Sequence, residues 1–141
     1  MRLNDLPFPV YGDAGFRGKC PTEDRELVTF FNRLRAEYPD TWGAVALHPR
    51  NEGLRKKGQI GAVHRHRIEG MTQGAADIII PGNPAFVCEL KRCDHTKSAW
   101  QDGQIEYLTA ASSCGAFTCV ALGWQAAWAA LEDWIALQHR A

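Results

Sequence analysis

Residues 74–80, with the sequence GAADIII, and residues 86–91, FVCELK, are two short apolar runs. Between them lies PGNP at residues 81–84, and such a cluster of Pro, Gly and Asn favours a turn between two strands. The sequence therefore predicts a β-hairpin that has Asp77 at the base of its first strand. A Glu-x-Lys sequence lies near the end of its second strand.

The second strand of this hairpin carries different side chains on its two faces, because successive side chains of a strand point in opposite directions. One face carries Val87, Glu89 and Lys91, and the other carries Phe86, Cys88 and Leu90. Together with Asp77, Glu89 and Lys91 place two carboxylates beside an ammonium group, an arrangement suited to holding a divalent cation and an attacking water. The alternative is an exposed ion pair of little energetic weight, because Glu-x-Lys is a common tripeptide.

The composition of the 141-residue chain is that of an ordinary globular domain. Hydrophobic residues make up 45% and charged residues 23%, and the length suits one domain with a sizeable core. The formal net charge is zero, which argues against a protein that binds nucleic acid over its whole surface. No apolar run is long enough to span a bilayer, and residues 1–6 lack the apolar core of a signal peptide. We therefore expect a cytoplasmic protein.

Five cysteines, an odd number, argue against a framework of disulfide bonds. Cys88 and Cys93, like Cys114 and Cys119, have four residues between them, so a zinc site has to be considered. Cys88 and Cys119, however, fall within expected strands, where small buried hydrophobic side chains are common. A structural role is therefore favoured over zinc binding.

The first 20 residues are rich in Pro and Gly without periodicity, and they predict an irregular arm. A helix is expected from Pro21 onwards, because apolar residues recur at helical spacing. These residues are Leu27, Phe30, Phe31 and Leu34. Glu23 lies in line with this apolar stripe near the helix start, whereas Glu26 is expected well to one side of it. The inward carboxylate either interacts with the helix dipole or reaches a metal site behind the helix, and the sequence leaves both open.

Residues 43–48, GAVALH, predict a first buried strand, and a markedly basic segment follows at residues 50–67. That segment has six Lys or Arg residues against the single acid Glu52, with His64 and His66 interspersed. Such a segment is commonly a solvated loop, but Lys and Arg also neutralise phosphates and release counterions. We therefore expect this segment to contact nucleic acid. The candidate contact residues are Arg50, Asn51, Arg55, Lys56, Lys57, Arg65 and Arg67.

A second helix is expected to open at Thr96, where Ser98 and Gln101 fit a capping box, and to stop at Gly115. Its inward stripe comprises Trp100, Gln104, Tyr107, Leu108 and Ala111. Gln104 is a polar residue within this stripe, and a buried glutamine requires hydrogen-bond partners. The nearest polar cluster is the group of carboxylates and lysine on the hairpin.

Residues 117–122, FTCVAL, predict a further strand that ends at Gly123. The last part of the chain predicts an amphipathic helix. Its apolar stripe comprises Trp124, Trp128, Leu131 and Ile135. These tryptophans are better suited to a core or a dimer face than to a platform on which bases stack.

The ordered set of elements resembles the PD-(D/E)XK nuclease superfamily, and more narrowly its VRR-NUC domain family in the compact stand-alone form found in phages and bacteria. The resemblance covers about residues 23–123. The matching residues are 48–53 (HPRNEG), Gly70, 74–77 (GAAD), 86–91 (FVCELK), Gln104 and 117–123 (FTCVALG). One departure is Ala76, which stands where the name of the superfamily has a proline before the aspartate. That proline shapes the turn and carries no chemistry.

The resemblance implies an α/β fold of the restriction-endonuclease-like type, an α/β/α core with a central mixed β-sheet flanked by helices. It implies a single VRR-NUC-like nuclease domain over residues 1–141, in which residues 1–20 are an irregular N-terminal arm. It also implies a protein of the bacterial cytosol or of a phage-infected host cell.

The resemblance further implies the roles of the site residues. Asp77 and Glu89 would ligate Mg²⁺ or Mn²⁺ together with the backbone carbonyl of Leu90, since these ions prefer oxygen ligands. Lys91 would orient or deprotonate the attacking water and offset the negative charge of the phosphorane. Gln104 would fix the lysine or the water.

The first helix of the family supplies one more acid, which contacts the metal directly or through water. Glu23 would match this helix-one glutamate by its inward position. Glu26 is the alternative for the same role, because nothing in the sequence anchors the register of this helix.

The activity implied by the resemblance is that of a Mg²⁺-dependent endodeoxyribonuclease, which hydrolyses phosphodiester bonds. Stand-alone members of the family tend to be homodimers that cut branched DNA such as Holliday junctions, and the last helix is one candidate dimer face. Two alternatives stay open, a DNA-binding module on the same fold that does not cleave and a restriction-type endonuclease with sequence specificity. The combination of Asp77, Glu89, Lys91 and Gln104 argues against a pure binding module, and 141 residues leave little room for a separate recognition domain.

Overall fold

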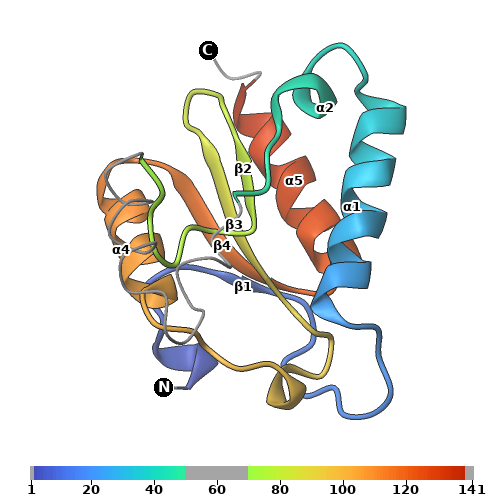
Figure 1. Cartoon of the computed structure of the whole chain (residues 1–141), viewed down its shortest axis with the longest axis vertical. Coiled ribbons are helices and arrows are strands. Elements are labelled where there is room, and N and C mark those ends of the chain that lie inside the picture. The colour runs from blue at the N-terminus through green and yellow to red at the C-terminus, as the bar shows by residue number, and fades with distance from the viewer. Residues whose placement is uncertain (1, 50–69, 139–141) are drawn as a thin grey trace.

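The computed structural model of the chain describes residues 2–49 and 70–138, and it contains a mixed four-stranded β-sheet with helices on both faces (Figure 1). The strands are β1 (Val10–Tyr11), β2 (Ile78–Ile80), β3 (Phe86–Lys91) and β4 (Phe117–Leu122), in the order β1-β4-β3-β2 across the sheet. The helices are α1 (Glu23–Glu37), α2 (Trp42–Val45), α4 (Gln104–Ser113) and α5 (Trp124–Gln138), with the short 3₁₀ turns η1 (Leu3–Asp5) and η3 (His95–Lys97). None of the described helices is long and apolar enough to cross a membrane. The predicted α/β architecture, a central mixed sheet flanked by helices, is confirmed.

The hairpin predicted around PGNP is present. Strand β2 pairs antiparallel with β3, with Ile78 opposite Cys88. Strand β3 pairs in parallel with β4, so that Glu89 lies opposite Val120. Strand β4 covers residues 117–122, as the sequence predicts. All six residues of β3 are buried, because both of its long edges are paired and both of its faces are covered.

One face of the sheet packs on α1 and α5, which Figure 1 shows to the right of the strands. The buried residues of this large core are Phe30, Phe31, Leu34, Ile78, Ile80, Phe86, Cys88, Leu90, Cys119, Ala121, Ala127, Trp128, Ala130, Leu131 and Trp134. The ring of Trp134 lies 4.9 Å from that of Trp42 and 5.5 Å from that of Phe86, measured between centroids. Trp128 and Trp134 are therefore core residues, which removes them from the candidate dimer face.

The other face of the sheet packs on α4 and on the N-terminal arm. Its buried cluster is smaller and comprises Phe8, Ala76, Val87, Leu108, Val120 and Leu122. The alternation predicted for β3 is confirmed, because Val87 belongs to this small cluster whereas Cys88 and Leu90 belong to the large core. Glu89 and Lys91 lie on the same face as Val87 and are also buried.

The N-terminal arm is more ordered than the sequence predicts. Strand β1 pairs in parallel with β4 and extends the sheet, and Phe8 just before it is buried. The prediction of an irregular arm over residues 1–20 is therefore wrong for this part. The strand has only two residues, too few to leave a periodic pattern in the sequence.

Residues 43–48 do not form the predicted strand. Trp42–Val45 form the single turn α2, and Leu47 makes only an isolated bridge with Ile79. The turn is attached to the end of α1, where the Gly43 N–H donates to the carbonyl oxygen of Tyr38 at 2.8 Å. A short apolar run fits a strand or a buried helical turn, and the pattern alone does not separate them.

The helix predicted from Thr96 begins later, at Gln104, with Gly103 as its N-cap residue. The turn η3 occupies the predicted start, and Trp100 lies outside the helix. The predicted stop is confirmed, because α4 ends just before Gly115, whose φ is +95°.

The capping box predicted for this helix is absent, because Ser98 has other partners. Its hydroxyl accepts a hydrogen bond from the Arg92 N–H at 2.9 Å and donates one to Glu23 at 2.9 Å. The N–H of Gln101 donates instead to the side chain of Gln104, at 2.8 Å. The segment before α4 is therefore a loop tied to β3 and α1.

All five cysteines are free thiols, as their odd number suggests. Cys88 and Cys119 are fully buried and lie opposite each other in β3 and β4. They pack within the large core, in agreement with the structural role that the sequence favours.

Candidate active site

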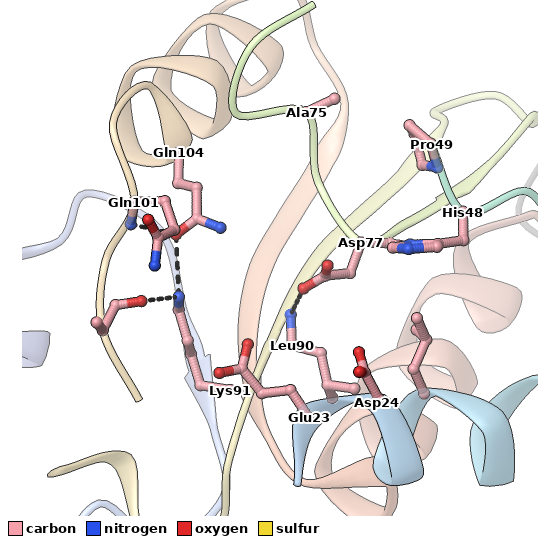
Figure 2. Close-up of a pocket in the computed structure, with 12 residues that line it drawn as sticks. Glu23, Asp24, His48, Pro49, Ala75, Asp77, Leu90, Lys91, Gln101 and Gln104 are labelled. Carbon is pink, nitrogen blue, oxygen red and sulfur yellow. Dashed lines mark hydrogen bonds between the residues drawn. The ribbon is translucent and has the colours of Figure 1, made fainter. Parts of the chain in front are cut away.

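A pocket of about 350 Å³ lies where the first turn of α1, the start of β2, the end of β3 and the start of α4 meet (Figure 2). Its lining residues are Glu23, Asp24, Leu27, His48, Pro49, Ala75, Asp77, Leu90, Lys91, Ala99, Gln101 and Gln104. The pocket thus brings together five of the predicted site residues from four separate elements. Glu89, the remaining one, is not part of the lining and lies buried next to it.

A close backbone contact between two glycines helps to form the pocket. Gly74 has a φ of +78°, and a Cβ atom there would lie 2.2 Å from the carbonyl carbon of Gly103. Only glycine allows this approach, since any side chain would overlap the neighbouring backbone. The contact joins the segment before Asp77 to the start of α4, and it places Asp77 and Gln104 at the same pocket.

Asp77 is held through both its side chain and its backbone. Its carboxylate Oδ2 accepts a hydrogen bond from the Leu90 N–H at 2.9 Å. The Nδ1 atom of His48 lies 2.7 Å from the Asp77 carbonyl oxygen. Because a carbonyl can only accept, Nδ1 carries the proton, and in the neutral ring Nε2 keeps its lone pair. Figure 2 shows His48 and Asp77 side by side at the edge of the pocket.

Glu89 is a fully buried carboxylate with an unsatisfied oxygen. Its Oε2 accepts a hydrogen bond from Nε2 of Gln104 at 3.2 Å, whereas its buried Oε1 has no hydrogen-bond partner. Burial raises the pKa of Glu89 well above its ordinary value, and the negative charge of Asp77 raises it further. An unsatisfied buried carboxylate oxygen is costly for the fold.

Lys91 is 2% exposed and is fixed by three groups. Its Nζ donates to the carbonyl oxygen of Ala99 at 2.8 Å and to Oε1 of Gln104 at 3.0 Å. The same Nζ lies 4.4 Å from the centroid of the Trp100 ring, within cation–π range. Gln104 therefore connects the ammonium group of Lys91 with the carboxylate of Glu89.

Glu23 and Glu26 have different positions in the structure. Glu23 lines the pocket, where burial raises its pKa although the charge of Lys91 and the hydroxyl of Ser98 lower it. Glu26 is 3% exposed, and its carboxylate accepts a short hydrogen bond from the N–H of Trp124, the first residue of α5. The expectation that Glu26 lies well to one side of the inward stripe is wrong.

The register of α1 explains this correction. Glu26, Phe30 and Leu34 recur every four residues and are all buried, so the inward stripe contains Glu26. Its carboxylate is tolerated there because it meets the positive N-terminal end of α5. Glu23, near the start of the same helix, is left free to face the pocket.

The donor set fits Mg²⁺ or Mn²⁺. Among the residues that the structure describes, no three His, Cys, Asp or Glu side chains are grouped to hold a metal ion. The site offers two carboxylates, those of Asp77 and Glu89, and the backbone of Leu90, whose side chain is buried in the large core. Mg²⁺ commonly binds through one or two carboxylates and keeps several waters. A cation held by both carboxylates would also satisfy the unpartnered Oε1 of Glu89.

Seven residues of the pocket were not predicted as functional from the sequence, and four of them contribute charge or hydrogen bonds to the site. Asp24 adds a third acid to the lining, and His48 holds the backbone of Asp77. The Ala99 carbonyl accepts a hydrogen bond from Lys91, and the Gln101 N–H donates one to Gln104, which also holds Lys91. The HPRNEG match contains His48, but nothing in it indicates a contact with a residue 29 positions later. Ala99 and Gln101 lie in a segment that the pattern predicts as helix.

The predicted nucleic-acid contacts lie outside the described residues. Arg50, Asn51, Arg55, Lys56, Lys57, Arg65 and Arg67 all belong to the segment 50–69. Pro49 and Gly70, the residues on either side of this segment, are described, and Pro49 lines the pocket. The last described residue before this segment therefore lies at the pocket.

Comparison with known proteins supports the fold. No protein-family model matches the sequence, and no curated protein matches it. Among solved structures, the chain is similar to one described as a VRR_NUC domain protein, with a TM-score of 0.66 and 18% sequence identity. The match covers 86% of this chain and 93% of that chain. The chain thus has the fold of this VRR_NUC domain protein over most of the length of both.

Proposed function

We propose that this protein is a metal-dependent nuclease that hydrolyses phosphodiester bonds of DNA. The observation that carries the proposal is the buried, unpartnered Oε1 of Glu89, adjacent to Asp77 and linked through Gln104 to Lys91. The similarity in fold to a VRR_NUC domain protein supports it. A structural ion pair would not need an inward lysine and two carboxylates at the edge of an open pocket.

The metal would be held by Asp77, Glu89 and the backbone carbonyl of Leu90, with Glu23 contacting it directly or through water. When bound, Mg²⁺ or Mn²⁺ supplies Lewis-acid polarisation of the phosphate and lowers the pKa of a bound water. The side chains of this chain supply binding, orientation and proton handling.

Lys91 is the residue best placed to act on the attacking water and the phosphate. Its Nζ is held by Ala99 and Gln104 and lines the pocket. From there its ammonium form would orient the water and stabilise the negative charge that develops on the phosphate oxygens, whereas deprotonation of the water would require the neutral amine. Gln104 positions the lysine, because its Oε1 accepts from Nζ at 3.0 Å.

The substrate that we propose is branched DNA such as a four-way junction, cut by a homodimer. A small domain with one site needs a second copy to cut two strands symmetrically. The basic segment 50–67 would contact phosphates beside the site, because the chain leaves the pocket at Pro49. We propose that residues 1–141 form a single domain with this activity.

The test is cleavage of labelled four-way junction, duplex and single-stranded DNA in Mg²⁺, Mn²⁺ or EDTA, beside the Lys91→Ala variant. We expect cutting that requires metal, is strongest on the junction, and falls by at least about 100-fold in Lys91→Ala. Binding of the same DNA in EDTA should be nearly unchanged in the variant. Equal cutting of all three DNAs would retain the nuclease and exclude the junction preference.

A DNA-binding module without cleavage is the second candidate function. It predicts salt-dependent binding of DNA and no cutting in any metal. The buried carboxylate of Glu89 favours the nuclease, because a binding module derives no benefit from a costly acid that contacts no DNA phosphate. A restriction-type enzyme is a third candidate, which sequence-specific products in the same assay would reveal.

A further inference from the structure

A second pocket, of about 520 Å³, adjoins Lys91 between the N-terminal arm and the loop that follows β3. Its lining residues are Arg2, Leu3, Asn4, Ala14, Lys91, His95, Thr96, Ser98 and Trp100. In Figure 1 these segments are the blue arm and the gold turn η3 below the sheet. Of this set, Lys91 also lines the candidate active site.

The two pockets share a wall. Lys91 lines both of them. Ser98 lines the second pocket and donates a hydrogen bond to Glu23, which lines the first. Trp100, which also lines the second pocket, lies 4.4 Å from the Lys91 Nζ. A molecule in the second pocket would therefore lie directly beside the residue that we assign to the reaction.

The linings of the two pockets differ in charge. Lys91 lines both pockets, but the first also contains the acids Glu23, Asp24 and Asp77, whereas the second contains no Asp or Glu side chain and has Arg2 as a further cation. The first suits a cation and the second suits an anion, since each sign of charge attracts its opposite.

Asp94, the acid next to the second pocket, is already engaged. It is 3% exposed, and its carboxylate accepts hydrogen bonds from the N–H groups of Gly18 at 3.0 Å and Thr96 at 3.1 Å. The Thr96 hydroxyl donates to it as well. These bonds lower the pKa of Asp94 to about 2. They also attach η3 to the N-terminal arm, so both walls of the pocket are fixed in place.

The second pocket also offers a flat apolar surface. Leu3, Ala14 and Trp100 line it alongside its polar groups. Its volume lies in the range of about 300–1,000 Å³ that is typical of small-molecule sites. An apolar wall with an indole ring, flanked by cations and neutral donors, matches a nucleotide, which has a planar base and an anionic phosphate.

We propose that this second pocket binds the nucleotide adjacent to the bond that is cut. The base packs against Trp100, and the phosphate contacts Arg2 and His95. The identification of this nucleotide as part of the substrate strand rests on the proposed function. The N-terminal arm, which the sequence predicts as irregular, then serves as a substrate-binding wall.

The test is binding of a short labelled single-stranded oligonucleotide in EDTA, measured by fluorescence anisotropy. We expect Trp100→Ala to weaken binding by about tenfold, since stacking of a base on an aromatic ring is worth about 1–3 kcal/mol. Trp100→Phe should retain most of the affinity. Arg2→Gln should weaken binding and lower the slope of log Kd against log salt by about one. Arg35→Gln, at the far end of α1 and outside both pockets, is the matched control.

A series of oligonucleotides, each lacking the base at a different single position, locates the base that contacts Trp100. At one position, loss of the base should weaken binding to the wild-type protein as much as Trp100→Ala does. The same loss should not weaken binding to Trp100→Ala any further, because the contact is already absent. Trp100 also packs against the small core cluster, so circular dichroism establishes that the variant is folded. If it is not, Trp100→Phe and Arg2→Gln carry the test.

The failure of this proposal and that of the proposed function are distinguishable. Unchanged affinity in Arg2→Gln and Trp100→Ala, or no effect of any abasic position, would overturn the nucleotide pocket even if the protein cuts DNA. The predicted losses of affinity without cleavage in any metal would support the pocket as a nucleotide site and exclude the nuclease.

Discussion

The two faces of the central sheet differ in composition: one is wholly apolar at its core, whereas the other combines a smaller apolar cluster with buried charged groups. Strand β3 contributes Phe86, Cys88 and Leu90 to the large core under α1 and α5. To the other face it contributes Val87, which belongs to the small apolar cluster, and the charged residues Glu89 and Lys91, which lie at or next to the pocket. The first face therefore provides stability, and the second places charged groups where they are costly.

The difference shows how a small domain tolerates a buried active site. Burying Glu89 with an unsatisfied oxygen destabilises the folded state. The aromatic core on the opposite face offsets this cost and holds β3 in register, so the two carboxylates and the lysine keep fixed positions. Active sites commonly use stability in this way.

Loss of the large core gives the largest expected effect. Trp134 is fully buried, and its Nε1–H donates to the Pro84 carbonyl at 2.7 Å. Trp134→Ala should lower the free energy of unfolding by about 3–5 kcal/mol, because it leaves a cavity. It also leaves the Pro84 carbonyl with only its longer hydrogen bond, from Nε2 of Gln138 at 3.3 Å. Urea unfolding followed by circular dichroism measures the change. Val28→Ala, at a site 59% exposed, is the control and should change stability by less than about 0.5 kcal/mol.

A change on the other face of the sheet should instead lower activity and leave the protein folded. Glu89→Gln should lower the rate of DNA cleavage in Mg²⁺ by at least about 100-fold, because it removes a negative ligand from the proposed metal site. The protein should remain folded. Glu132→Gln, an exposed change on α5, is the control and should cleave at the wild-type rate. A Glu89→Gln enzyme of full activity would exclude the proposed role of Glu89.

Glu89→Gln should also change stability, by a smaller amount. Burial raises the pKa of Glu89 in the folded state above its ordinary value of 4.5, which applies in the unfolded state. Between the unfolded-state and the folded-state pKa, the folded protein therefore binds the proton more tightly than the unfolded chain does. Stability in EDTA should therefore fall as the pH rises from 4.5 through the folded-state pKa. Glu89→Gln should remove this part of the pH dependence and be more stable than the wild type at neutral pH by about 1–3 kcal/mol.

Urea unfolding of wild type and variant at several pH values, in EDTA, measures this difference directly. Groups that do not interact with Glu89 titrate equally in both proteins and cancel, so the difference reports Glu89 together with its charged neighbours Asp77, Lys91 and Glu23. A difference in stability that stays constant with pH would show that Glu89 does not titrate as described.

The sequence predicts the hairpin and β4 well because their signals are local. Alternating side chains, the PGNP turn and the stop at Gly123 lie within or next to the elements that they define. The face of β3 that carries Glu89 and Lys91 follows from the same alternation. Gln104 is also found from the sequence, because a glutamine in an apolar stripe needs a polar partner.

What the sequence does not reveal depends on contacts between distant segments. Ser98 fits a capping box locally, but its hydroxyl bonds with Glu23, 75 positions earlier. The choice between Glu23 and Glu26 depends on where α5 begins, 98 positions after Glu26. The second pocket depends on an arm with no periodicity. In each case a tertiary contact overrides the local pattern.

The two glutamates of α1 provide the smallest and most discriminating comparison, because each is expected to affect a different property. Glu23→Gln should lower cleavage by about tenfold, in line with the loss of a group that supports a metal site, and leave stability unchanged. Glu26→Gln should lower the free energy of unfolding by about 1 kcal/mol, because Glu26 caps the N-terminus of α5. Its cleavage rate at a temperature where it is folded should equal that of the wild type.

Cleavage rate and free energy of unfolding should be measured for both Glu23→Gln and Glu26→Gln. The results test whether one glutamate of α1 serves the reaction and the other serves stability. Gly123 bears on the result, since a Cβ atom there would lie 2.9 Å from Oε2 of Glu26. Gly123→Ala should lower stability by more than Glu26→Gln does, because Gly123 has a φ of +93° and its Cβ atom would also lie 2.5 Å from Sγ of Cys93. If Glu26→Gln instead slows cleavage and Glu23→Gln does not, the helix-one acid is Glu26, and α5 must move to release it.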